Sequence, residues 1–113
     1  MFRVRFVIAA LAASSIALAA PSGAMAGDAK AGWQKALQCQ TCHGLDGMAK
    51  LPEAPNLAGQ SEVYLVKALK DFRSGARRND TMSLVIANLN DTDIADLAAY
   101  FAAIPVTAGT PPK

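Results

Sequence analysis

The sequence predicts an all-α domain in which three main helices and long loops enclose one short motif of cysteines and a histidine. Apolar residues recur every three or four positions in three segments, as on the buried face of a helix, and no segment shows the alternation of a strand. A capping residue precedes each segment, and glycine or proline follows two of them. The only two cysteines and the only histidine lie together in Cys39-Gln40-Thr41-Cys42-His43.

Residues 1–26 have the pattern of a cleaved secretory signal peptide. Arg3 and Arg5 precede an apolar run of 15 residues, and Ala24-Met25-Ala26 forms a small-residue cleavage site. The run is shorter than the roughly 20 residues that span a bilayer, which argues against the alternative of an uncleaved anchor. After cleavage nine basic and nine acidic residues remain, so the basic balance of the full chain does not indicate nucleic-acid binding.

The first helix is predicted at residues 28–38. Asp28 is placed to cap its N-terminus. Its apolar face is formed by Ala29, Gly32, Trp33, Ala36 and Leu37. Glycine inside a helix is unfavourable unless another element approaches closely. We therefore expect a helix contact at Gly32, and we expect Trp33 to be a core aromatic.

The cysteine motif follows directly and predicts a covalently bound haem c. Cys-x-x-Cys-His is the attachment signature of c-type haem. Two thiols three positions apart lie on one turn of helix, so Cys39 and Cys42 can both form thioethers with the vinyl groups along one porphyrin edge. The imidazole of His43 then points at the iron, and histidine is a common proximal ligand. One haem per chain is expected.

Other sites built on Cys-x-x-Cys fit this chain less well. A zinc site needs a second pair of ligands, which the sequence does not contain. A thioredoxin-like dithiol follows a strand within a βαβ unit, and no strand pattern occurs here. A disulfide between residues this close would close a very small loop and would constrain the unfolded chain little.

A loop and a second helix are predicted after the motif. Residues 44–59 lack periodicity and are rich in glycine and proline, and a loop of this length suggests that it wraps around something. The helix follows at 60–75, with Ser61 as its cap and Gly75 as its stop. Its apolar stripe is formed by Leu65, Leu69 and Phe72, with Val66 beside it.

The last part of the chain is predicted to hold a short helix or turn at 83–89 and then the third main helix. Asn90 and Asp93 form a pair like a capping box, and Pro105 ends the helix. Its apolar stripe is formed by Ile94, Leu97, Ala98, Phe101 and Ile104. The domain therefore covers residues 27–105, and the proline-rich residues 106–113 are expected to be a disordered tail.

The second axial ligand can be argued by elimination. No other histidine is present, and the only methionines after the signal peptide are Met48 and Met82. Met48 follows His43 so closely that about 18 Å of fully extended chain would have to pass round the porphyrin rim. Met82 lies 39 residues after His43, far enough to reach the iron from the opposite face. Ordinary core packing is the alternative for Met82.

Taken together, these motifs resemble a class I c-type cytochrome. The chain most resembles the small single-haem periplasmic proteins related to one half of the dihaem bacterial cytochromes c. The resemblance covers nearly all of the chain after the signal peptide. It rests on Cys39-Gln40-Thr41-Cys42-His43-Gly44, Pro55-Asn56-Leu57-Ala58-Gly59-Gln60, Phe72-Arg73-Ser74-Gly75 with Arg77, Met82, and the segment from Asn90 to Phe101.

The resemblance implies the all-α cytochrome c fold. In that fold the first and last helices cross closely, here near Gly32 and the face of Leu97, Tyr100 and Phe101. It also implies that the backbone carbonyl of Pro55 accepts a hydrogen bond from the His43 ring, which would fix the orientation of this ligand. Further contacts near the haem propionates are implied for Gln60, Tyr64, Arg73 and Arg77.

The expected function is electron transfer in the periplasm, without enzymatic activity. Two strong axial ligands, His43 and Met82, would leave the iron no open position for oxygen or a substrate. Two alternatives stay open: a haem subunit of a larger oxidoreductase, and a haem sensor or peroxidase with Met82 off the iron. We expect a monomer, without a membrane span after signal cleavage, whose partners are periplasmic or membrane-bound redox proteins of a respiratory chain.

A cluster of basic residues at 67–78 offers a possible docking surface. A positive patch beside an exposed haem edge would steer encounters with an acidic partner. The alternative is that Lys67 and Lys70 belong to a solvated helix face, since exposed charges contribute little.

Overall fold

The computed structural model describes residues 26–113, so the predicted signal peptide lies outside the described residues except for Ala26. Five helices and no strand occur in this part of the chain, which confirms the all-α fold class. The three longer helices are α1 (Ala29–Ala36), α3 (Glu62–Ser74) and α5 (Asp91–Ala103). The two short ones are α2 (Gln40–His43) and α4 (Asp80–Val85). None of these helices is long and apolar enough to cross a membrane.

The predicted capping residues set the ends of α3 and α5. The Ser61 hydroxyl accepts a hydrogen bond from the Tyr64 N–H, and Gly75 ends α3 in the left-handed region with φ of 83°. At the start of α5 the Asn90 side chain accepts from the Asp93 N–H, and the Asp93 side chain accepts from the Asn90 N–H. The capping box is therefore confirmed.

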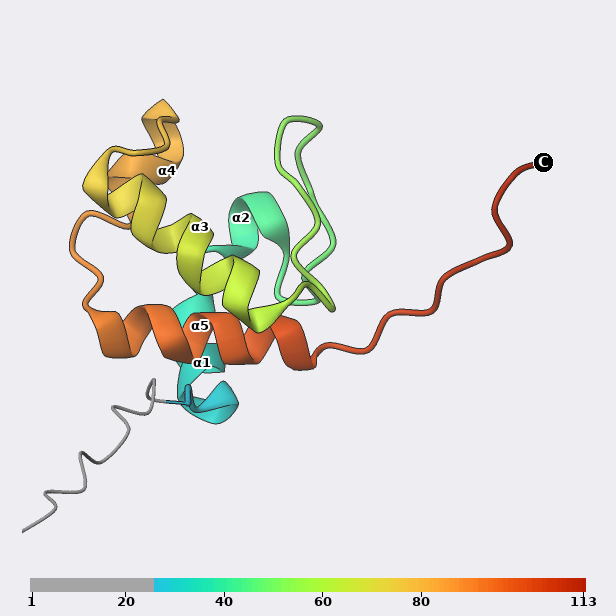
Figure 1. Cartoon of the computed structure of the whole chain (residues 1–113), viewed down its shortest axis with the longest axis horizontal. Coiled ribbons are helices and arrows are strands. Elements are labelled where there is room, and N and C mark those ends of the chain that lie inside the picture. The colour runs from blue at the N-terminus through green and yellow to red at the C-terminus, as the bar shows by residue number, and fades with distance from the viewer. Residues whose placement is uncertain (1–25) are drawn as a thin grey trace, which may run out of the picture.

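α1 and α5 cross at the predicted glycine (Figure 1). A Cβ atom on Gly32 would lie 2.0 Å from the backbone oxygen of Asp96 and 2.7 Å from the Cβ of Tyr100, so only glycine allows this approach. Ala36 and Leu97 are buried in the core beside the crossing. Because α2 follows α1 after only three residues, this crossing also fixes where the cysteine motif stands relative to α5.

A buried carboxylate holds the same two helices together. Asp96 is only 5% exposed, and its Oδ1 accepts a hydrogen bond from the Asp28 N–H at 2.7 Å. Its Oδ2 lies 2.6 Å from Lys35 Nζ, which also pairs with Asp93 at 2.8 Å. The Lys35 ammonium, and then the Asp28 N–H, lower the pKa of the Asp96 carboxyl below its ordinary value of 3.8.

The outer face of α1 differs from the prediction. Trp33 is 44% exposed and Leu37 is 42% exposed, so the expectation that Trp33 is a core aromatic was wrong. The reason is that α1 packs mainly against a single helix, α5. The close approach at Gly32 and Ala36 buries only a narrow strip of α1, and the predicted apolar stripe is wider than that strip.

Two helix boundaries also differ. α1 ends at Ala36 rather than at residue 38. α4 covers Asp80–Val85 rather than 83–89, because the Asn79 side chain caps it by accepting a hydrogen bond from the Met82 N–H at 2.9 Å. Met82 therefore lies within a helix and not in the polar segment before one.

Candidate functional site

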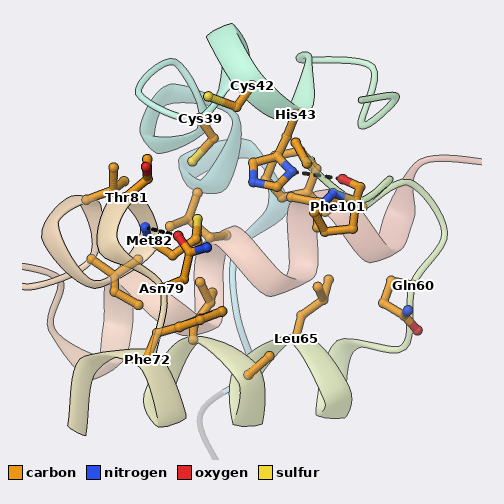
Figure 2. Close-up of a pocket in the computed structure, with 18 of the residues that line it drawn as sticks. Cys39, Cys42, His43, Gln60, Leu65, Phe72, Asn79, Thr81, Met82 and Phe101 are labelled. Atoms are coloured by element: carbon orange, nitrogen blue, oxygen red, sulfur yellow. Dashed lines mark hydrogen bonds between the residues drawn. The ribbon is translucent and has the colours of Figure 1, made fainter. Parts of the chain in front are cut away.

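The cysteine motif opens onto a cavity of about 330 Å³ (Figure 2). Its wall is formed by α2, α3, α4, α5 and the loop at 44–59. Most of the lining side chains are apolar and include Leu57, Leu65, Leu69, Phe72, Val85, Ile86, Leu89, Leu97 and Phe101. A largely apolar cavity with a few convergent polar groups is typical of a cofactor site.

Both cysteines line this cavity as free thiols. Cys39 lies immediately before α2 and Cys42 lies within it, both are half-buried, and no disulfide joins them. Burial, with a smaller contribution from the neighbouring Cys42, raises the pKa of the Cys39 thiol to about 11. A dithiol redox site instead needs a lowered thiol pKa. The arrangement therefore does not favour the thioredoxin-like alternative.

His43 is buried at the end of α2, and one of its ring nitrogens is hydrogen-bonded to the backbone. The residue is 6% exposed, and its Nδ1 lies 2.9 Å from the backbone oxygen of Pro55. A carbonyl oxygen can only accept, so Nδ1 carries the proton and Nε2 keeps a lone pair. This is the His43–Pro55 pairing that the resemblance implies. It prepares Nε2 to bind a metal.

Of the two candidate methionines, only Met82 lines the cavity. Figure 2 shows the Met82 side chain directed into the cavity from α4, while His43 enters it from α2. Met48 is 45% exposed in the loop at 44–59 and does not belong to the cavity lining. The structure thus brings together Cys39, Cys42, His43 and Met82, as the sequence predicts.

The remaining predicted residues differ in whether they line the cavity. Pro55, Gln60, Tyr64 and Arg77 line the cavity, and the Arg77 guanidinium lies 4.5 Å from the centroid of the Phe72 ring. Arg73, which was predicted to lie near the haem propionates, does not line the cavity. The reason is that Arg73 donates hydrogen bonds to the backbone oxygen of Leu89 at 2.9 Å and to Asp91 at 2.6 Å, which hold it at the junction of α3 and α5.

Five polar or charged residues on the cavity wall were not predicted as site residues. They are Gln38, Glu53, Asn56, Asn79 and Thr81. Asn56 lies in the motif that begins at Pro55, so its position there could have indicated a role. Asn79 could have been recognised as a helix cap from its residue type. Thr81 offers no signal beyond being next to Met82.

The basic cluster at 67–78 is largely paired. Lys67 forms an ion pair with Asp71, four residues along the same helix. Lys70 and Arg73 both pair with Asp91, at 3.5 and 2.6 Å. Because Lys70 and Arg73 share one carboxylate, these pairs reduce the positive charge of the cluster without removing it, and the docking surface stays a prediction.

The residues around the cavity fit a covalently attached haem. Two unpaired thiols lie at one edge, an imidazole with a free lone pair enters from α2, and a thioether enters from α4. Apolar side chains from α3, α5 and the segment 85–89 form much of the remaining wall and would contact a flat porphyrin.

The chain is similar to known cytochromes over most of its described part. The family model described as cytochrome c matches residues 28–104. The chain is 48% identical over 84 residues to cytochrome c4 of Pseudomonas aeruginosa, covering 74% of this chain and 42% of the relative. It is 46% identical over 79 residues to cytochrome c-554(548) of Halomonas halodenitrificans, covering 67% of this chain and 95% of the relative.

Solved structures give the same result. Reduced recombinant cytochrome c4 from Pseudomonas stutzeri matches with a TM-score of 0.65 and 41% identity, over 69% of this chain and 46% of that chain. Thiosulfate dehydrogenase from Marichromatium purpuratum matches with a TM-score of 0.65 and 29% identity, over 74% of this chain and 20% of that chain. The chain spans about half the length of the cytochrome c4 relatives that it matches.

Proposed function

This chain belongs to the cytochrome c family, and on that premise we propose that it is an electron carrier that takes up and releases one electron at a haem iron. Members of the family bind haem c covalently, so haem c is the cofactor of this chain. When bound, the haem supplies the redox chemistry. The protein's own residues hold it, ligate its iron and limit the access of water.

In this proposal the thiols of Cys39 and Cys42 would hold the haem through thioethers, and His43 Nε2 and the Met82 sulfur would ligate its iron. The observation that carries the proposal is that all four side chains line one apolar cavity, with His43 Nδ1 already hydrogen-bonded to Pro55. With both of these residues bound to it, the iron would have no position left for a substrate. A thioether ligand opposite histidine favours the reduced state and raises the potential.

The walls of the cavity have a second role in the proposal. Leu65, Leu97 and Phe101 are buried, so they keep water from much of the site. These side chains would hold a bound haem in surroundings of low dielectric constant, where electrostatic interactions are stronger than in water. Gln60, Tyr64 and Arg77 are exposed lining residues, and we assign them to the polar edge of the haem.

We further propose that the carrier acts in the periplasm as a monomer and exchanges electrons with other redox proteins. The signal-peptide pattern at 1–26 supports export. A relative of 44% identity over 71 residues, in Stutzerimonas stutzeri, is named thiosulfate dehydrogenase electron acceptor, which supports a protein as the electron donor.

A second candidate function is that of a haem subunit of a larger oxidoreductase. The match to 20% of a thiosulfate dehydrogenase chain favours it, because a domain of this fold occurs there within a larger protein. Such a subunit would co-purify with a large partner at stoichiometric amounts, whereas a free carrier would be recovered alone.

The test is a redox titration of protein exported and matured in a haem-attaching host. We expect one electron per chain, a ferrous form that does not bind carbon monoxide, and a mass equal to residues 27–113 plus one covalent haem. Rapid carbon monoxide binding by the ferrous protein, or turnover of peroxide, would show an open iron position and support the sensor or peroxidase alternative instead.

A further inference from the structure

We propose that Asn56 is a positioning residue for His43 and acts through the peptide group that joins Pro55 to Asn56. The inference rests on the proposed function, because it takes His43 as an axial ligand. It concerns how the protein sets the orientation and basicity of the His43 ring. The evidence for it is a set of hydrogen bonds within the loop at 44–59.

The Asn56 side chain closes this loop on itself. Its Oδ1 accepts a hydrogen bond from the Ala49 N–H at 2.7 Å. The next two residues continue the pairing, since the N–H groups of Leu57 and Ala58 donate to the Gly47 oxygen at 2.7 and 3.1 Å. Residues 47–49 are therefore bonded to residues 56–58, and Asn56 contributes the side-chain bond nearest to Pro55.

The carbonyl that meets His43 belongs to the peptide unit held by these bonds. The oxygen of Pro55 and the nitrogen of Asn56 lie in one planar peptide group. The proline ring fixes φ of Pro55 but leaves ψ free, so the orientation of the carbonyl depends on how the chain after Pro55 is held. The 2.9 Å contact with His43 Nδ1 therefore depends on the bonds that hold residues 56–58. If Asn56 loses its bond to Ala49, the peptide group can tilt and this contact weakens.

The strength of the hydrogen bond between His43 and Pro55 affects the reduction potential of an iron that His43 ligates. A hydrogen-bond acceptor on the second ring nitrogen fixes the orientation of a ligating histidine and raises its basicity. A more basic imidazole stabilises the more positively charged, oxidised iron. Loss of the Asn56 bond should therefore raise the reduction potential. It should also let the Nδ1 proton of His43 exchange faster with solvent.

The test compares the haem-loaded wild type with the Asn56→Ala variant. Proton NMR of the reduced protein follows solvent exchange of the His43 Nδ1 proton, and a redox titration gives the potential. We expect exchange to accelerate at least severalfold. We also expect the reduction potential to rise. The rise should correspond to a two- to tenfold change in the equilibrium constant for electron transfer, where tenfold equals about 59 mV for one electron.

Two further variants act as controls. Asp46→Ala removes a different side-chain bond of the same loop, the one from the Met48 N–H at 3.0 Å, and should leave the exchange of the Nδ1 proton unchanged. Asn56→Asp keeps an acceptor oxygen for Ala49 and should restore slow exchange. If Asn56→Ala retains no haem, Asn56→Ser replaces it, with fast exchange expected in Ser and slow exchange in Asp.

The outcomes separate this inference from the proposed function. A low-spin wild type whose Asn56→Ala variant is merely less stable, with exchange rate and potential unchanged, would overturn the role of Asn56 and leave the carrier function in place. A wild type without a low-spin spectrum would instead contradict the proposed function itself.

Discussion

His43 and Asp96 are the two buried polar or charged side chains in the described part of the chain, and their hydrogen bonds serve different ends. His43 uses Nδ1 to contact Pro55 and keeps Nε2 for a ligand. Asp96 uses both carboxylate oxygens to hold Asp28 and Lys35. Buried polar groups normally find hydrogen-bond partners within the protein. Asp96 has a protein partner for each oxygen, whereas His43 keeps Nε2 for a bound ligand.

The predicted effect of Asp96→Asn is a loss of stability that depends on pH. The carboxylate form is favoured in the folded protein, so its contribution is present above the ordinary pKa of 3.8 and is lost as pH falls below it. At neutral pH the variant should be less stable by roughly 1.5–3 kcal/mol, the range for a hydrogen bond to a charged group. Unfolding in urea at neutral pH and at pH near 3 measures both values.

The matched control is Asp46→Asn. Asp46 also pairs with a lysine, Lys50 at 2.9 Å, but its side chain is 58% exposed. Because exposed ion pairs contribute little, its replacement should change the free energy of unfolding much less than Asp96→Asn does. A constant stability gap between wild type and Asp96→Asn at both pH values would show that the carboxylate charge is not what matters.

At the residue level the sequence was informative about the ligands and uninformative about structural partners. His43 and Met82 could be proposed as iron ligands, and Cys39 and Cys42 as attachment sites, because few residue types take these roles and each is rare after the signal peptide. The partner of Asp96 could not be named, because Lys35 lies 61 positions away and only the packing of the helices brings them together.

At the scale of the helices, the crossing of α1 and α5 depends on the missing side chain of Gly32. Gly32→Ala should destabilise the protein although alanine favours a helix by about 1 kcal/mol, since the added Cβ meets backbone atoms that cannot move aside. Overpacking of this kind costs about 1–3 kcal/mol. Thermal unfolding monitored by circular dichroism measures the change.

Gln34→Ala serves as the control in the same helix. Gln34 is exposed, so alanine there should be neutral or slightly stabilising. If Gly32→Ala proved as stable as Gln34→Ala, the close approach of the two helices would not hold in solution.

The sequence predicted where helices begin and end better than which faces they bury. Caps such as Ser61 and Asn90 act locally, through side-chain bonds to neighbouring N–H groups, so residue type was sufficient. Whether Trp33 is buried depends on how many elements pack against α1, and a local sequence pattern does not contain that information. The start of α4 was missed because Asn79 was not recognised as a cap.

For the whole molecule, the arrangement of charges predicts weak electrostatic steering. Nine basic and nine acidic residues follow the predicted signal peptide, and the lysines of the cluster at 67–78 are paired. Between about 0.01 M and 0.15 M salt we expect rates of electron exchange with small anionic and cationic redox reagents to change less than about threefold.

Stopped-flow measurements with the wild type and a Lys67→Gln/Lys70→Gln variant test this. The two proteins should show similar salt dependence with both reagents. A rate for the anionic reagent that falls steeply with salt in the wild type only would show that the lysines form a positive docking surface after all.

The cavity illustrates what sequence could and could not predict at this scale. The order of motifs predicted that both cysteines, His43 and Met82 meet at one site. It could not predict that the Leu89 oxygen and Asp91 hold Arg73, since they become its neighbours only when α3 packs against α5. It also gave no reason to connect Asn56 with His43.

The central claim, histidine and methionine ligation of a covalently held haem, is tested most directly by one visible spectrum. The exported wild type, Met82→Ala and the control Met48→Ala are each recorded oxidised and reduced. We predict low-spin spectra with a weak far-red ferric band for wild type and Met48→Ala, and loss of that band in Met82→Ala. A wild type that is high-spin, or a Met82→Ala variant that keeps the band, would contradict the assignment of Met82.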